Sequence, residues 1–170
     1  ISIIQFKGLA TALLKEKGSL NQFVEKLNSH IVASPFNSPL SCYFLKIEKG
    51  SPVVEWISCG YGSLWKLNET IQKKPCRFPA LGFDSTAFFE TEKFVPEPGS
   101  TLVICPPSEQ EALFEEAQFL SLLEEVRTLP PQKLAETLYL KGKARHIHFF
   151  EEHPFVLLAL HFPMEKNEPL

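Results

Sequence analysis

The sequence almost lacks aspartate. Of the 20 acidic residues among 170, 19 are glutamate, and Asp84 is the only aspartate. Any site that needs a cluster of aspartates is therefore excluded within these residues. Basic runs are missing as well, because the three arginines lie far apart and the net charge is −3. Without a basic surface field, neither nucleic acid nor an anionic membrane is an expected partner.

Long apolar runs and closely spaced cysteines are also missing. The longest apolar run covers residues 155–160, far short of the roughly 20 residues that span a bilayer, so we expect no membrane contact by this segment. The four cysteines form no Cys-x-x-Cys pair, and three of them lie in apolar, strand-like stretches. We therefore expect reduced, buried thiols and a cytoplasmic location.

The rest of the composition is typical of a folded domain. Hydrophobic residues make up 44% and charged residues 22% of the chain, which favours a globular fold over disorder. Because no linker divides the sequence, we expect a single domain over residues 1–170. The chain opens at Ile1, and the apolar residues 1–4 are typical of a buried strand. We therefore expect it to be part of a longer protein.

The hydrophobic periodicity predicts helices before and after a run of strands. Ser19 and Gln22 form a capping box at the start of the second helix. The expected helices cover residues 7–17, 19–31, 108–126 and 131–141, and the expected strands cover residues 42–47, 53–59, 64–67, 87–95, 101–105, 144–149 and 155–162. Strands segregated from helices in this way favour an α+β fold with antiparallel sheets over a doubly wound βαβ fold.

Six short motifs occur along the chain, at expected turns and in expected helices. They are Lys7-Gly8-Leu9-Ala10, Leu27-Asn28, Cys59-Gly60-Tyr61, Pro79-Ala80-Leu81-Gly82, Glu97-Pro98-Gly99-Ser100 and the stretch from Pro106 to Ala112. In order and spacing they resemble the SpoIIE/RsbU-like branch of the PPM-type, metal-dependent serine/threonine phosphatases. The resemblance covers nearly the whole chain and starts partway through the family's domain. It implies the family's α-β-β-α sandwich of mostly antiparallel sheets.

The residues at the family's metal positions depart from the family pattern. Family members hold two Mn²⁺ or Mg²⁺ ions with aspartates, and the resemblance assigns these positions to Ile3, Pro107, His153 and Pro154. Hard divalent ions require oxygen ligands, which isoleucine and proline side chains do not supply. We therefore expect no metal ligand, no catalytic residue and no cofactor among these residues, while enzyme activity as such stays open.

Glutamates near these positions leave a rebuilt metal site as an alternative. Glu151 and Glu152 precede His153, and Glu109 and Glu111 follow Pro107. A glutamate carboxylate reaches about 1.5 Å further than that of aspartate, roughly one C–C bond, whereas ligand distances tolerate only about 0.2 Å. The favoured interpretation is a solvated turn for the first pair and helix-capping acids for the second.

Histidines and a cysteine offer two weaker candidate sites. His146 and His148 share one face of a predicted strand, so with His153 or His161 they form a candidate Zn²⁺ site. Cys105 with His153 is a candidate nucleophile pair. Ordinary strand histidines and a core cysteine are the favoured interpretations, because neither spacing matches a strong signature.

Two functional hypotheses follow from the resemblance, and a third applies if it fails. The first is a degenerate, catalytically silent domain that binds proteins. The resemblance implies anti-anti-sigma (STAS) proteins, their anti-sigma kinases or a second phosphatase chain, such as a homodimer, as partners in sigma-factor signalling. The second is an active phosphoserine/phosphothreonine protein phosphatase that uses Mn²⁺ or Mg²⁺ in a rebuilt site. The third is an unrelated α+β binding domain.

Overall fold

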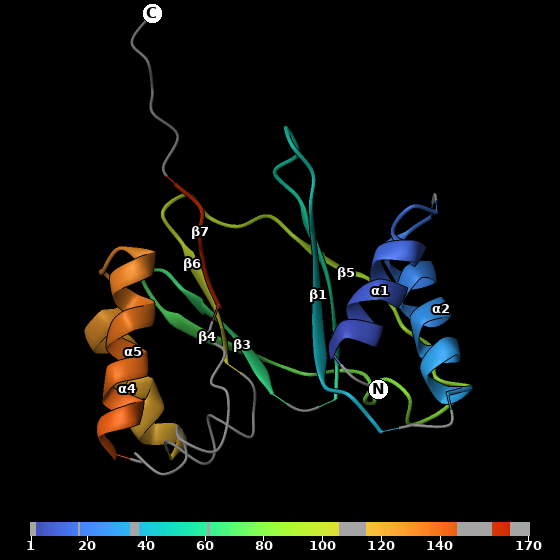
Figure 1. The fold of residues 1–170 in the computed structure, drawn as a ribbon. Coiled ribbons are helices and arrows are strands. Elements are labelled where there is room, and N and C mark those ends of the chain that lie inside the picture. Colours follow the sequence, from blue (N-terminus) through green and yellow to red (C-terminus); the bar gives the residue numbers. More distant parts are fainter. Residues whose placement is uncertain are drawn as a thin grey trace, which may run out of the picture. The chain divides into compact units, whose positions relative to one another are not determined.

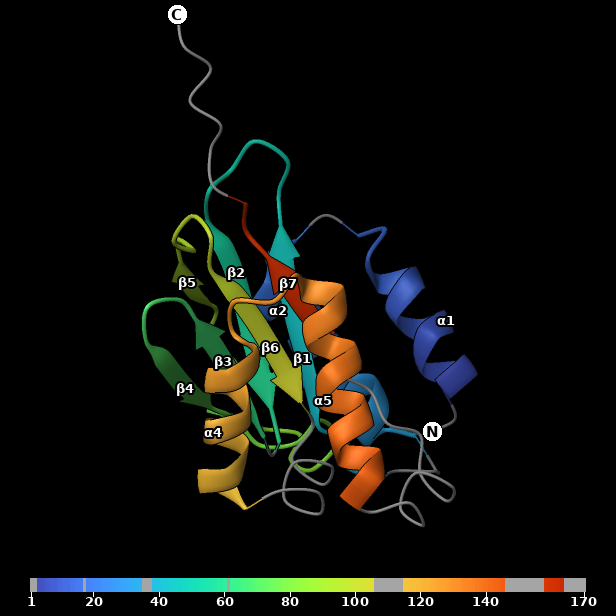
Figure 2. The same cartoon turned by 90° about the vertical axis from the view of Figure 1, so that its left-hand side faces the viewer.

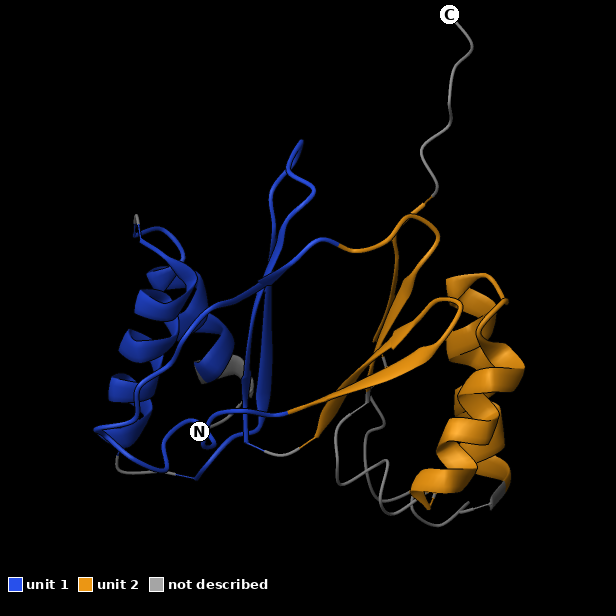
Figure 3. Ribbon diagram, turned by 180° about the vertical axis from the view of Figure 1, so that it is seen from behind, with its two compact units in different colours: residues 1–61, 76–95 blue, residues 62–75, 96–170 orange. Residues whose placement is uncertain are grey.

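The computed structural model describes residues 3–16, 18–34, 38–60, 62–105, 115–145 and 158–163. The chain forms two compact units, each made from two stretches of sequence (Figure 3). Unit 1 contains residues 1–61 and 76–95, and unit 2 contains residues 62–75 and 96–170. In each unit the described residues combine an antiparallel sheet with a pair of helices.

Unit 1 contains a three-stranded sheet in the order β1-β2-β5 and two helices (Figure 1). Its elements are α1 (Ile3–Leu13), α2 (Leu20–Val32), β1 (Cys42–Ile47), β2 (Val54–Cys59) and β5 (Glu92–Phe94). β1 and β2 form the predicted hairpin, with Cys42 opposite Cys59 at its open end and Ile47 opposite Val54 near the turn. The register of this hairpin places the two cysteines side by side.

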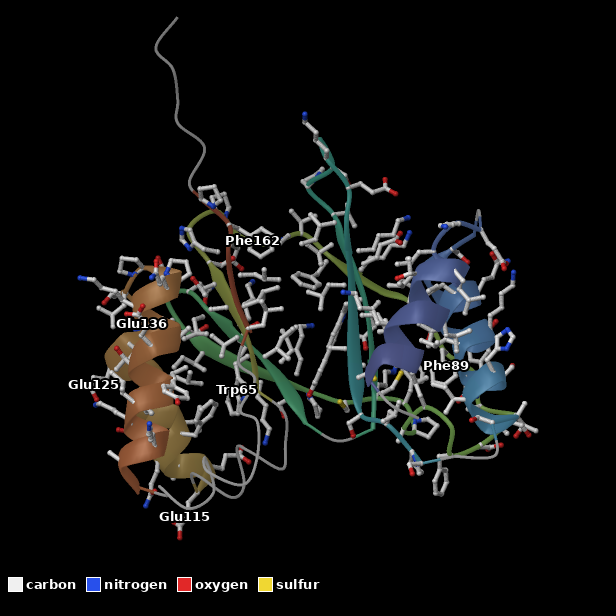
Figure 4. All side chains as sticks on the ribbon, in the orientation of Figure 1. Trp65, Phe89, Glu115, Glu125, Glu136 and Phe162 are labelled. Atoms are coloured by element: carbon white, nitrogen blue, oxygen red, sulfur yellow. The ribbon has the colours of Figure 1, made fainter. Side chains whose placement is uncertain are left out.

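The core of unit 1 lies between its helices and one face of its sheet. Leu27 and Ile31 of α2 form a fully buried cluster with Ile57 and Cys59 of β2. Phe89 belongs to the same cluster and lies beside the helices (Figure 4). Each fully buried side chain of this size contributes about 1.5–3 kcal/mol, so this cluster adds substantially to the stability of unit 1.

Unit 2 contains a four-stranded sheet in the order β4-β3-β6-β7, with two helices on one face (Figure 2). Its elements are β3 (Ser63–Leu67), β4 (Ile71–Pro75), β6 (Thr101–Cys105), α4 (Glu116–Val126), α5 (Pro131–Arg145) and β7 (Leu158–His161). Trp65 of β3 meets Phe119 of α4 edge-on, with ring centroids 5.5 Å apart. Leu134 and Leu138 of α5 complete this buried cluster.

The observed elements confirm the predicted α+β class and most of the predicted order. β1 and β6 have the predicted bounds. The start of α2 is also as predicted, because the Ser19 backbone N–H donates a hydrogen bond to Gln22 Oε1 at 3.1 Å. These elements are specified by local patterns that a sequence displays directly.

The structure corrects the predicted elements at several points, including α1, which ends at Leu13, and α4, which begins at Glu116. Residues 3 and 4 begin helix α1 and do not form a strand, because a short apolar run suits either conformation. β4 lies in a stretch that the sequence indicated as a connection. Of the strand predicted over residues 87–95, only Glu92–Phe94 pairs, and α5 continues to Arg145, past its predicted end near Lys141.

Candidate functional site

The described residues contain one of the four positions that the family resemblance assigns to metal ligands. Ile3 begins α1, where its backbone is helical. The residues of predicted interest that lie outside the described residues are Pro107, Glu109, Glu111, His146, His148, Glu151, Glu152, His153 and Pro154. The expectation that these positions hold no metal therefore stays a prediction.

The only aspartate of the chain has a structural partner. Asp84 Oδ1 accepts hydrogen bonds from the backbone N–H and from the hydroxyl of Thr86, both at 2.8 Å. These two bonds hold the pKa of the Asp84 carboxyl below its usual range, and the bond from the backbone N–H has the larger effect. The Ala87 N–H also donates to the Asp84 carbonyl at 3.3 Å. Asp84 therefore closes a tight turn in unit 1.

A buried amide fixes the motif that precedes this turn. Asn28 is 1% exposed on α2. Its Oδ1 accepts the Gly82 N–H at 2.8 Å, and its Nδ2 donates to the Asp84 carbonyl at 2.9 Å. Leu81, next to Gly82, exchanges two backbone hydrogen bonds of 2.9 Å with Leu40. The motifs Leu27-Asn28 and Pro79-Ala80-Leu81-Gly82 thus meet through one side chain.

The Glu97-Pro98-Gly99-Ser100 motif forms the predicted tight turn in unit 2. The Ser100 N–H donates to the Glu97 carbonyl at 2.9 Å, and Gly99 adopts a φ of 81°, which favours glycine. Lys66 Nζ donates to Glu97 Oε1 at 2.6 Å, and the Asn68 amide donates to Oε2. The Lys66 bond is the main cause that lowers the pKa of the Glu97 carboxyl.

Arg127 extends this polar cluster to helix α4. One guanidinium nitrogen donates to the carbonyls of Asn68 and Glu69, each at 2.8 Å, and Nε lies 2.9 Å from a carboxylate oxygen of Glu124. The sequence identified the glycine turn but not its charged partners. Lys66 lies within the buried strand β3, and no local pattern connects it with Glu97, 31 residues further on.

Replacing Glu97 with glutamine is expected to change how stability depends on pH. Because the folded-state pKa of Glu97 is lowered, its carboxylate stabilises the fold above the unfolded pKa of about 4.3. That contribution is lost as the pH falls through the folded pKa. In urea unfolding, we expect Glu97→Gln to be less stable than the native chain at neutral pH and equal to it at a pH below the folded pKa of Glu97. A difference that is the same at both pH values would contradict this role of the charge.

The two weaker candidate sites are only partly described. His161 ends β7 opposite Thr101, whose Oγ1 lies 3.1 Å from His161 Nδ1. Cys105 ends β6. Among the described residues, no three histidine, cysteine, aspartate or glutamate side chains lie close enough together to hold a metal ion. Within the same described ranges, no helix has both the length and the apolar character needed to cross a membrane.

A groove of about 610 Å³ follows strand β1 in unit 1. Residues 43–47 all line it, although successive strand side chains point to opposite faces, so the groove runs along the edge of the strand. Two ion pairs border it, Lys26 with Glu16 and Lys46 with Glu48. Most of the other lining residues are apolar, and the charges of Glu16, Lys26 and Lys46 are paired within the chain.

Comparison with protein families gives a match to stage II sporulation protein E (SpoIIE) over residues 1–148. Comparison with curated protein sequences finds no match. The match to the SpoIIE family covers most of both units.

Solved structures share the fold at low sequence identity. The phosphatase domain of SpoIIE from Bacillus subtilis, presoaked with manganese, has a TM-score of 0.62 and 12% identity over 100% of this chain and 78% of that chain. The SiaA-PP2C domain of Pseudomonas aeruginosa has a TM-score of 0.75 and 12% identity, and the match covers 94% of this chain and 68% of that chain. The structure of the RsbU and RsbW domains of a Mycobacterium tuberculosis protein has a TM-score of 0.71 and 12% identity. That match covers 95% of this chain and 48% of the other. These likenesses confirm the predicted α+β fold of the PP2C, or PPM, phosphatase type.

Proposed function

Because this chain belongs to the SpoIIE family, whose model matches residues 1–148, we propose that it is a degenerate phosphatase domain that acts by binding proteins. The observation that carries this proposal is the position of its only aspartate. Asp84 closes a turn with Thr86 in unit 1. It does not lie at any position that the resemblance assigns to a metal ligand. The aspartates that bind the metal ions in the family are therefore missing within these residues.

The residue types present do not fit a pair of Mn²⁺ or Mg²⁺ ions. Such ions take oxygen ligands, mainly carboxylates. Ile3, Pro107 and Pro154 have no side-chain oxygen, and His153 offers nitrogen, which suits softer metals. The Asp84 carboxylate already accepts two hydrogen bonds. We therefore propose that the domain works without a cofactor.

The proposed partners are the regulatory proteins that the family resemblance implies. They are anti-anti-sigma (STAS) proteins, their anti-sigma kinases or a second copy of this chain, in sigma-factor partner switching in the cytoplasm. The solved Mycobacterium tuberculosis protein contains both an RsbU domain and an RsbW domain. This supports the proposal that the present domain contacts regulatory proteins. An inactive domain that retains the phosphatase fold could bind a substrate-like protein without altering it.

Calorimetry and a phosphate-release assay test the loss of catalysis. We expect no heat of binding when Mn²⁺ or Mg²⁺ is added to the chain, and no phosphate release from a phosphoserine STAS protein at any metal concentration. The Bacillus subtilis SpoIIE phosphatase domain, assayed in parallel, controls for substrate and metal quality. Turnover that depends on added Mn²⁺ would overturn the proposal in favour of an active phosphatase with a rebuilt site.

Two substitutions test that alternative directly. If Glu151 and Glu152 had replaced the lost ligands, Glu151→Gln or Glu152→Gln would abolish any Mn²⁺-dependent activity while leaving the thermal midpoint of the protein unchanged.

Binding is tested separately, by titrating the chain with purified STAS protein in its phosphorylated and unphosphorylated forms. Saturable binding without turnover supports the proposed function, and the absence of binding to both forms and to the anti-sigma kinase, with no self-association, contradicts it.

A further inference from the structure

Two cysteines lie side by side at the open end of the β1–β2 hairpin. Cys42 is the first residue of β1 and Cys59 the last of β2, and the two are direct partners in the antiparallel register. Both thiols are free; Cys59 is fully buried and Cys42 half-buried. Directly opposed residues have side chains on the same face of a sheet, and both cysteines contact the apolar cluster of unit 1.

The backbone geometry of this pair suits a covalent bond. Directly opposed residues of antiparallel strands have Cα atoms about 4.5–5.5 Å apart. Disulfides join residues whose Cα atoms are about 4.4–6.8 Å apart. The register therefore places the Cα atoms of Cys42 and Cys59 within the range of a disulfide.

The open end of the hairpin is also held closely together. Gly60 adopts a φ of 89°, and a Cβ added there would lie 2.9 Å from the Ser41 Cα. The Gly60 N–H donates to the Phe78 carbonyl at 2.8 Å. The backbones of the two strands therefore approach closely beside the cysteines.

We propose that Cys42 and Cys59 form a site of reversible oxidation that links β1 to β2 through a disulfide. With hydrogen peroxide as oxidant, the thiolate of the half-buried Cys42 attacks one peroxide oxygen, becomes a sulfenic acid and releases hydroxide. The Cys59 thiolate then attacks that sulfur, forms the S–S bond and expels a second hydroxide. The two thiol protons convert both hydroxides to water, so peroxide gains the two electrons that the thiols lose.

Burial makes this oxidation slow at neutral pH. It raises the pKa of the Cys42 thiol to about 11, so roughly one thiol in ten thousand is a thiolate at pH 7. Burial also raises the pKa of Cys59, and the titratable groups that add to this effect are the thiols of Cys42 and Cys76. We therefore expect the rate of disulfide formation to rise up to about tenfold per pH unit between pH 7 and pH 9.

Peptide mapping of the full chain tests the proposal. After treatment with hydrogen peroxide, the remaining thiols are alkylated, and digestion without reductant is expected to yield a peptide linking Cys42 to Cys59. Cys76→Ser should retain this linked peptide, whereas Cys42→Ser should lose it. The thermal midpoint should rise on oxidation and return to its starting value with dithiothreitol.

A denatured sample supplies the control that needs no variant. In urea, the same oxidant should give a mixture of links among all four cysteines, because the register no longer selects partners. Links from Cys76 to Cys42 or Cys59 in the folded chain, or links only between chains, would overturn the proposal. So would Cys42 and Cys59 thiols that stay intact after prolonged treatment at pH 9, where the folded pair is expected to react up to about a hundredfold faster than at pH 7. None of these outcomes depends on the proposed binding function.

Discussion

Replacing Asn28 with alanine is expected to lower the free energy of unfolding by about 3 kcal/mol. The side chain is 1% exposed and makes hydrogen bonds to the Gly82 N–H and the Asp84 carbonyl. Alanine would leave the buried Gly82 N–H without a partner, would remove one of the two hydrogen bonds to the Asp84 carbonyl and would open a small cavity. Urea unfolding followed by circular dichroism measures the change.

An amide on the same helix gives a matched control. Asn21 lies near the start of α2 and accepts a hydrogen bond from the exposed Ser19 hydroxyl at 2.6 Å. We expect Asn21→Ala to lower the free energy of unfolding by less than about 0.5 kcal/mol. Equal losses in the two variants would show that the Asn28 amide does not hold the Gly82–Asp84 segment, and that alanine at either position affects only the helix.

The family-like turns could be predicted because each depends on a local pattern. Gly82 and Gly99 adopt φ values of 79° and 81°, which few other residues tolerate. The glycine directly after Pro98 indicated one turn, and the family resemblance indicated the other. The resemblance also singled out Leu27-Asn28. It did not reveal why an asparagine lies there, because its partners are 54 and 56 residues away. Contacts of that range depend on the finished fold.

Strand β4 could not be predicted for a related reason. Two lysines and a proline occupy Ile71–Pro75, so the strand lacks an alternating apolar pattern. It pairs with β3 along its whole length, and backbone hydrogen bonds to a neighbour do not appear in the composition of a strand. An exposed edge strand is therefore the kind of element that sequence patterns miss.

The predicted site remains a prediction for a different reason. Its metal positions fall on residue types that sequence alone excludes as ligands of hard cations, and only Ile3 among them lies in the described residues. What the structure adds is the role of Asp84. The sequence showed that this aspartate is alone, and the hydrogen bonds to Thr86 show that its carboxylate serves a turn.

Replacing Trp65 with alanine is expected to lower the free energy of unfolding by about 4 kcal/mol. The Trp65 side chain is 1% exposed and meets the Phe119 ring edge-on. Lys73 Nζ lies over the Trp65 ring, 5.4 Å from its centroid. The chain has two tryptophans, and the other, Trp56, is buried in β2 of unit 1. After the substitution, tryptophan fluorescence therefore reports on unit 1 while the damage is in unit 2.

This arrangement also tests the expectation of a single domain. Trp65→Phe is the control, because it keeps an aromatic ring in the cluster and leaves Trp56 as the same reporter. If the chain unfolds as one cooperative domain, the Trp56 transition in Trp65→Ala should shift to lower urea than in Trp65→Phe. An unchanged Trp56 transition, with loss of helix signal at lower urea, would instead show that units 1 and 2 unfold independently. We expect the shared transition, because a chain of this length with two small apolar clusters gains most of its stability when both form together.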